Sequence, residues 1–82
     1  MIYQYTPAGI CARSITINVE NGMVTDVQFV GGCNGNLKGI GSLVRGMRVE
    51  DVIARLEGIT CGPKSTSCPD QLAKALKAMQ NQ

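Results

Sequence analysis

The stretch SITINVENGMVTDVQFV, residues 14–30, decides the fold. Its first half alternates between apolar and polar side chains, which is typical of a strand with one buried face. Asn21 and Gly22 follow, and this pair is a strong signal for a two-residue hairpin turn because both residues tolerate a positive φ. Residues 23–30 then form the return strand. The apolar residues that we expect on the buried face of this hairpin are Ile15, Ile17, Val19, Val27 and Phe29.

The patterns on either side of the hairpin predict one more strand and three helices. A short strand is expected at about residues 2–6. Helical spacing of apolar residues begins at Leu37 and stops at Gly46, and it recurs over residues 49–57 and 69–79. The order β-β-β-α-α-α predicts an α+β fold, in which an antiparallel sheet built on the hairpin carries the three helices on one face. The apolar residues expected on the inner faces of the helices are Leu37, Ile40, Leu43, Val44, Val49, Val52, Ile53, Leu56, Leu72, Leu76 and Met79.

The composition excludes several classes of protein. The chain has 82 residues, so we expect a single domain over residues 1–82, and a core of this size often depends on a metal, a disulfide or oligomerisation. A net charge of +2 is too small to indicate a dedicated nucleic-acid binder. The absence of histidine excludes Ser-His and Cys-His catalytic centres. There is no secretory leader pattern and no apolar run long enough to span a bilayer, so we expect a cytoplasmic protein that does not bind membranes.

All four cysteines fall in predicted turns rather than on predicted core faces. They are Cys11, Cys33, Cys61 and Cys68. Because structural cysteines usually lie among core apolar residues, this distribution indicates a shared metal site, and four thiolates suit tetrahedral Zn²⁺ or an iron–sulfur cluster. Their spacing contains no C-x₂-C pair and matches no zinc-ribbon pattern. Paired disulfides and unrelated thiols therefore stay open as alternatives.

Cys68 lies in STSCPDQL, residues 65–72, where the last helix is expected to begin. Pro69 at the first helical position would make Cys68 the N-cap, whereas a cap at Ser67 would place Asp70 three residues on, as in a variant capping box. In either case the sulfur lies near the positive end of the helix dipole, which favours the metal-binding thiolate. Ser67 and Asp70 are candidates for hydrogen bonds around such a metal, although a carboxylate at a helix start is also ordinary.

The glycine-rich segment GGCNGNLKGIGS, residues 31–42, has two interpretations. Gly39 and Gly41 each weaken a helix by about 1 kcal/mol relative to alanine, so they indicate close packing or the close approach of a ligand. The segment contains neither a Walker loop nor a G-x-G-x-x-G fingerprint, and a tight turn with a solvated basic helix face explains it more simply. The residues of the weaker alternative, an anion or nucleotide site, are Gly35, Asn36, Lys38 and Arg45.

Two motifs resemble the TSCPD domain family: Gly-Cys-Asn-Gly-Asn at residues 32–36 and Thr-Ser-Cys-Pro-Asp at residues 66–70. The likeness covers nearly the whole chain and is closest to the short, stand-alone, four-cysteine branch of the family. Related domains occur at the C-terminus of adenosylcobalamin-dependent ribonucleotide reductases. The resemblance therefore implies an association with ribonucleotide reductase and deoxynucleotide metabolism, as an accessory rather than as the enzyme.

A more distant likeness is to NifU-type iron–sulfur scaffold proteins, whose three cysteines correspond in order to Cys33, Cys61 and Cys68. The scaffold has a histidine beside its last cysteine, where this chain has Ser67, and an acidic residue near its first cysteine, where this chain has neutral asparagines. These departures favour a closed four-sulfur site over transient cluster assembly.

The sequence therefore predicts a metal-binding accessory or interaction module, with structural zinc on the four cysteines, associated by resemblance with ribonucleotide reductase. Three alternatives stay open: an iron–sulfur scaffold or carrier, a nucleotide- or nucleic-acid-binding partner of ribonucleotide reductase, and a thiol redox protein that uses a Cys61–Cys68 disulfide. No catalytic residue is predicted, and we do not expect the chain to be an enzyme alone. The expected partner is a protein, ribonucleotide reductase among the candidates, or a nucleotide. Homo-oligomerisation also stays open.

Overall fold

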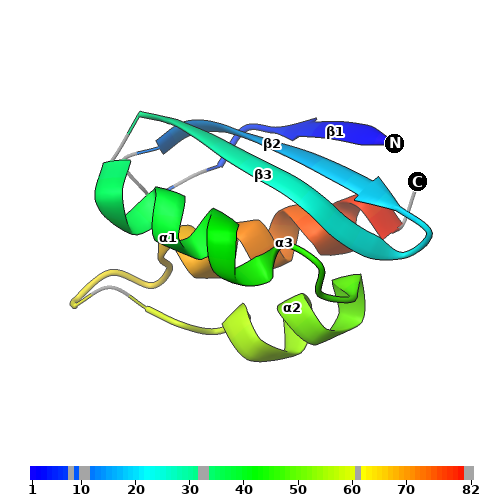
Figure 1. Ribbon diagram of the computed structural model, residues 1–82. Coiled ribbons are helices and arrows are strands. Elements are labelled where there is room, and N and C mark those ends of the chain that lie inside the picture. The colour runs from blue at the N-terminus through cyan, green and yellow to red at the C-terminus, as the bar shows by residue number, and fades with distance from the viewer. Residues whose placement is uncertain (8, 10–11, 32–33, 61, 81–82) are drawn as a thin grey trace.

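The computed structural model describes residues 1–7, 9, 12–31, 34–60 and 62–80, and it has the predicted α+β fold. Figure 1 shows a sheet of three strands as one layer and the helices beneath it as the other. The sheet is antiparallel, in the order β1-β2-β3. The strands are β1 (Ile2–Tyr5), β2 (Ala12–Glu20) and β3 (Met23–Gly31), and the helices are α1 (Asn34–Val44), α2 (Val49–Leu56) and α3 (Cys68–Gln80).

The hairpin between β2 and β3 forms as predicted, with two register shifts that the alternation does not reveal, one between Ala12 and Ser14 and one near the turn. Asn21 and Gly22 have φ values of 54° and 76°, as a tight hairpin turn of this kind requires. A shift in register follows the turn, because Val19 pairs with Val24 whereas the neighbouring Asn18 pairs with Asp26. Such a bulge adds one residue to a strand and reverses the faces beyond it. The bulge thereby allows Val24 to face the core together with Val27, although the two residues are three positions apart in the strand.

The core lies between the inner face of the sheet and the helices. Ile15, Ile17, Leu72 and Leu76 are fully buried in it. Tyr3 and Tyr5 on β1 are half-buried and pack against this cluster, so their rings serve the core. In the described part of the chain, no helix has the length and apolar character that a membrane span needs.

Gly41 seats α1 directly on β3. A Cβ atom at this position would lie 2.9 Å from the carbonyl oxygen of Val27, which is too close for any side chain. The prediction of close packing is therefore right for Gly41. It is wrong for Gly39, where a Cβ atom would meet nothing within 4 Å.

The prediction that Leu43 lies on the inner face of α1 is wrong, because its side chain is 78% exposed. Gly41 fixes which side of the helix faces the sheet. Leu37 and Val44 lie on this same side, and both are buried. At about 100° per residue, Leu43 lies roughly 130° from the centre of that side. The helix also begins at Asn34 rather than at Leu37. The apolar spacing does not predict this earlier start, because the three residues before Leu37 are polar or glycine.

The segment between α1 and α2 covers the beginning of β3. The backbone N–H of Gly46 donates to the carbonyl oxygen of Val24 at 2.7 Å, and the N–H of Val24 donates to the carbonyl oxygen of Met47 at 2.8 Å. Met23 and Arg48 form an isolated β-bridge beside these bonds. The start of α2 is thereby fixed against the sheet.

Candidate functional site

Ser67 is the N-cap of α3, which settles the choice between the two predicted caps. Its Oγ accepts a hydrogen bond from the backbone N–H of Asp70 at 3.2 Å. The same hydroxyl donates to the carbonyl oxygen of Ile59 at 2.7 Å. Cys68 is consequently the first residue of the helix, and it is half-buried. The cap therefore fixes both the start of α3 and the backbone of the preceding loop.

Asp70 is buried at the same helix start, with 3% of its surface exposed. Its Oδ1 accepts a hydrogen bond from the backbone N–H of Gly58 at 2.7 Å, and its Oδ2 accepts one from the hydroxyl of Thr66. The ammonium group of Lys74, one helical turn on, lies 3.3 Å from Oδ2. The bonds from Thr66 and Gly58, together with Lys74, lower the pKa of this carboxyl below its ordinary value, against the opposing effect of burial.

Thr66 connects this network to a third segment of the chain. Its Oγ1 accepts a hydrogen bond from the side-chain amide of Gln71 at 2.9 Å while donating to Asp70. On its other side, a Cβ atom at Gly9 would lie 3.1 Å from the methyl carbon of Thr66, so the backbone at Gly9 lies against this side chain. The sequence patterns do not predict the roles of Thr66, Gln71 and Gly58. The available signal is the concentration of polar residues between Ser65 and Gln71, on both sides of Cys68 and Pro69.

Of the four predicted metal ligands, the structure describes Cys68. Cys11, Cys33 and Cys61 lie outside the described residues, as does the side chain of Asn36. Within the described ranges, no group of three or more acidic or cysteine side chains could hold a metal ion. The prediction of a four-cysteine site therefore stays a prediction.

The residues next to the cysteines in the sequence lie at one end of the fold. Ala12 pairs with Gly31, so the beginning of β2 and the end of β3 are joined. Figure 1 shows this end of the sheet on the left, on the same side as the beginning of α1 and the loop between α2 and α3. The loop between α2 and α3 is held to the start of α3 by two hydrogen bonds, from Ser67 to Ile59 and from Gly58 to Asp70.

The weaker candidate, an anion site, lies elsewhere. Lys38 and Arg45 line one hollow of about 390 Å³ between α1 and β3. Arg45 lies 3.3 Å from Asp26 in an exposed ion pair, which offsets part of its charge. Gly35 is exposed in the first turn of α1 and does not line this hollow. Of the three predicted anion-binding residues whose side chains the structure describes, two, Lys38 and Arg45, therefore lie together.

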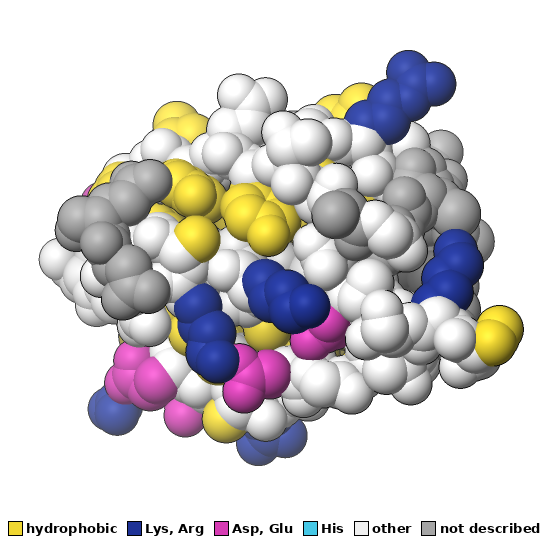
Figure 2. Space-filling view, turned by 180° about the vertical axis from the view of Figure 1, so that it is seen from behind, with side chains coloured by type: hydrophobic (Ala, Val, Ile, Leu, Met, Phe, Trp, Pro, Cys, Tyr) yellow, Lys and Arg dark blue, Asp and Glu magenta, His cyan; other side chains and the backbone are white. Residues whose placement is uncertain are grey.

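Basic and acidic side chains adjoin one another on part of the face shown in Figure 2. Dark blue and magenta side chains lie together in the lower part of this view, whereas two basic side chains on the right have no magenta neighbour there. Two lysines of α3 form ion pairs: Lys74 with Asp70 in the same helix, and Lys77 with Glu57, which follows α2. The described side chains on this face therefore do not form the continuous basic stripe that favours electrostatic binding of nucleic acid.

Comparison with known protein families matches residues 1–80 to the TSCPD domain. No curated protein and no solved structure matches the chain. The five residues that give this domain its name are Thr66 to Asp70 here, and three of them, Thr66, Ser67 and Asp70, form the capping network at the start of α3. The match extends over all six helices and strands of the structure. The chain therefore belongs to the TSCPD domain family.

Proposed function

We propose that this protein is a metal-binding accessory module in which Cys11, Cys33, Cys61 and Cys68 hold a structural zinc ion. The observation that carries the proposal is that the described residues flanking these cysteines are held together in space. Zinc bound there would cross-link these segments and so add to the folding free energy, which a core of this small size alone supplies only marginally.

Two contacts bring the N-terminal cysteine segments toward the last one. Ala12, which follows Cys11, pairs with Gly31, which precedes Cys33 by two positions. Gly9, two positions before Cys11, lies against Thr66, two positions before Cys68. Since a residue spans at most about 3.6 Å of extended chain, three of the four cysteines are tethered within a few residues of these two contacts.

The fourth cysteine belongs to the loop that Ser67 and Asp70 hold. Cys61 is two positions after Ile59, whose carbonyl oxygen accepts the hydrogen bond from Ser67. Asp70 is already engaged by Gly58, Thr66 and Lys74, so we assign it to positioning the loop rather than to the metal.

The chemistry of the donor set fits zinc. Four thiolates form a closed tetrahedral shell, and the chain contains no histidine to compete with them. Cys68 in the first turn of α3 lies at the positive end of the helix dipole, which stabilises a thiolate. The metal would supply a cross-link and no reaction step, which agrees with an accessory rather than a catalytic role.

The test compares the wild type with Cys68→Ser and with Thr60→Ala, which changes an exposed residue beside Cys61. All three are purified without oxygen and without a metal-binding tag. We expect one zinc per chain in the wild type and in Thr60→Ala, and loss of zinc with a lower melting temperature in Cys68→Ser. Iron with a sulfide absorption band would instead support the scaffold alternative. A metal-free wild type that forms a reversible Cys61–Cys68 disulfide would support the redox alternative.

A second candidate function, binding of a nucleotide phosphate, is favoured by the hollow that Lys38 and Arg45 share. It agrees with the association with ribonucleotide reductase that the family likeness implies. The test is titration with a deoxynucleoside triphosphate. Saturable binding that weakens with salt, is lost in Lys38→Ala and persists in Arg13→Ala would support it, because Arg13 is exposed and does not line the hollow.

A further inference from the structure

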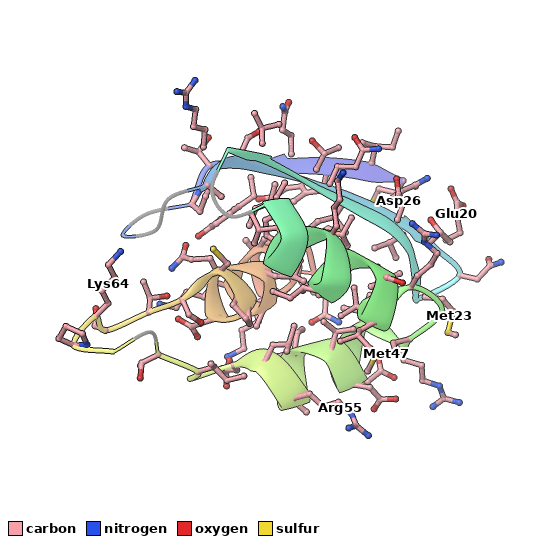
Figure 3. All side chains as sticks on the ribbon, turned by 60° about the vertical axis from the view of Figure 1, so that its left-hand side comes forward. Glu20, Met23, Asp26, Met47, Arg55 and Lys64 are labelled. Carbon is pink, nitrogen blue, oxygen red and sulfur yellow. The ribbon has the colours of Figure 1, made fainter. Side chains whose placement is uncertain are left out.

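A mainly apolar groove of about 700 Å³ lies between the end of α1 and α2, away from the cysteine-flanking end of the fold. Its apolar walls come from Met23, Leu43, Met47 and Leu56. Figure 3 shows Met23 and Met47 near each other on the side of the molecule opposite Lys64, with Arg55 on the neighbouring helix. Methionine side chains adapt their shape to a partner, so this wall suits an interface.

Leu43 gives this groove its apolar rim. Its side chain is 78% exposed, more than Ile2 at 70%, and it adjoins the half-buried Met47 and Leu56 around the groove. Scattered exposed apolar residues are ordinary, but one that continues into an apolar groove indicates an interaction surface. The sequence pattern placed Leu43 on the apolar face of α1, and the fold of one chain leaves it uncovered.

Three charged residues line the groove, the exposed Arg48 and the pair Asp51 and Arg55, and this pair can be complementary to its own copy. Asp51 and Arg55 lie one turn apart on α2, both line the groove, and neither forms an ion pair with another described residue. A two-fold axis that sets α2 antiparallel to its own copy places Asp51 opposite Arg55 of the partner subunit, and does so twice. Such an arrangement pairs opposite charges without needing any other protein.

We propose that the groove between α1 and α2 binds a second copy of this chain, forming a two-fold dimer. The apolar surface of Leu43, Met47 and Leu56 from both copies is covered in it, and two Asp51–Arg55 pairs fix the register. The proposal goes beyond the zinc site and does not depend on it, since none of these residues adjoins a cysteine in the sequence.

Exchanging the charges tests the register directly by sedimentation velocity over a concentration series. We expect the wild type to dimerise, and Asp51→Arg and Arg55→Asp each to raise the dissociation constant by at least about tenfold, since each places like charges opposite one another. Mixing the two single variants should form a heterodimer, and the double variant should dimerise again, because both combinations restore opposite charges. Circular dichroism confirms that each variant is folded.

Leu43→Gln tests the apolar part of the interface, with Ile2→Gln on β1 as the matched control, since both residues are highly exposed. Leu43→Gln should weaken the dimer by at least about tenfold and Ile2→Gln should leave it unchanged. A wild type that stays monomeric over the whole series would overturn the proposal. So would a dimer that is indifferent to the charge exchanges, or one that Ile2→Gln disrupts while Leu43→Gln does not. Binding of an acidic helix of another protein by a monomeric wild type would assign the groove to that partner instead.

Discussion

The carboxylate of Asp70 accepts a hydrogen bond from the backbone N–H of Gly58 at 2.7 Å, across twelve residues of chain. This bond closes the loop that contains Cys61 onto the first turn of the helix that begins with Cys68. A buried carboxylate is costly unless its oxygens are paired, and here each oxygen has a partner. Asp70 is therefore the residue through which the family motif controls the loop.

Asp70→Asn should destabilise the fold by about 1–3 kcal/mol, because the variant loses the negative charge that Lys74 and the two hydrogen-bond donors stabilise. The measurement is urea denaturation. Glu50→Gln, which neutralises an exposed carboxylate on α2, is the matched control and should change stability little. Equal stabilities of the two variants would contradict the role assigned to Asp70.

The lowered pKa of Asp70 predicts a specific dependence of stability on acid. The folded-state pKa lies below the ordinary value of 3.8, so the contribution of this group is fully present above that value. It is lost as the pH falls through the lower, folded-state pKa. Unfolding free energies measured from pH 7 downward should therefore fall more in the wild type than in Asp70→Asn, and the two curves should converge in acid. Parallel curves would show that the carboxyl is not stabilised in the fold.

Gly41→Ala should destabilise the protein by about 1–3 kcal/mol, because the added methyl group would meet the backbone carbonyl of Val27 and force α1 away from β3. Gly39→Ala in the same helix meets nothing within 4 Å, and it should be neutral or stabilise by up to about 1 kcal/mol through helix propensity. Thermal unfolding of the pair separates the two effects. Equal changes in melting temperature in the two variants would contradict the close contact of α1 with β3 at Gly41.

Ser67→Ala should cost about 1–2 kcal/mol, because it removes both the cap of α3 and the bond to Ile59. Ser42→Ala, an exposed change within α1, is the control and should be close to neutral. Amide hydrogen exchange provides the check, since the loss of protection in Ser67→Ala should concentrate in the first turn of α3. A uniform loss over the whole chain would argue against a local capping role.

Most of the fold could be predicted from local patterns. The bounds of α2 and α3 agree with expectation to within one residue at each end, because apolar spacing marks both helices and Gly58 follows the end of α2. The register shift between Asn18 and Val19 could not be predicted, because it depends on how the two strands pair. The exposure of Leu43 could not be predicted either, because it depends on how close Gly41 brings α1 to the sheet.

The site was predicted less completely than the fold. A cap at the start of α3 was expected, but Ser67 and Cys68 were equally good candidates in the sequence. The partners of Asp70 were not foreseen, because Gly58 donates through its backbone and no side chain marks that role. Contacts between segments far apart in the chain, such as Gly9 with Thr66, leave no periodic signal either.

The zinc content of the wild-type protein decides whether the four cysteines hold a structural metal. The protein is purified without oxygen and without a metal-binding tag, and its zinc is quantified by mass spectrometry against protein concentration. We expect one zinc per chain, retained through dialysis and released by denaturation. Protein that is folded and contains no zinc, with all four thiols reduced, would contradict it.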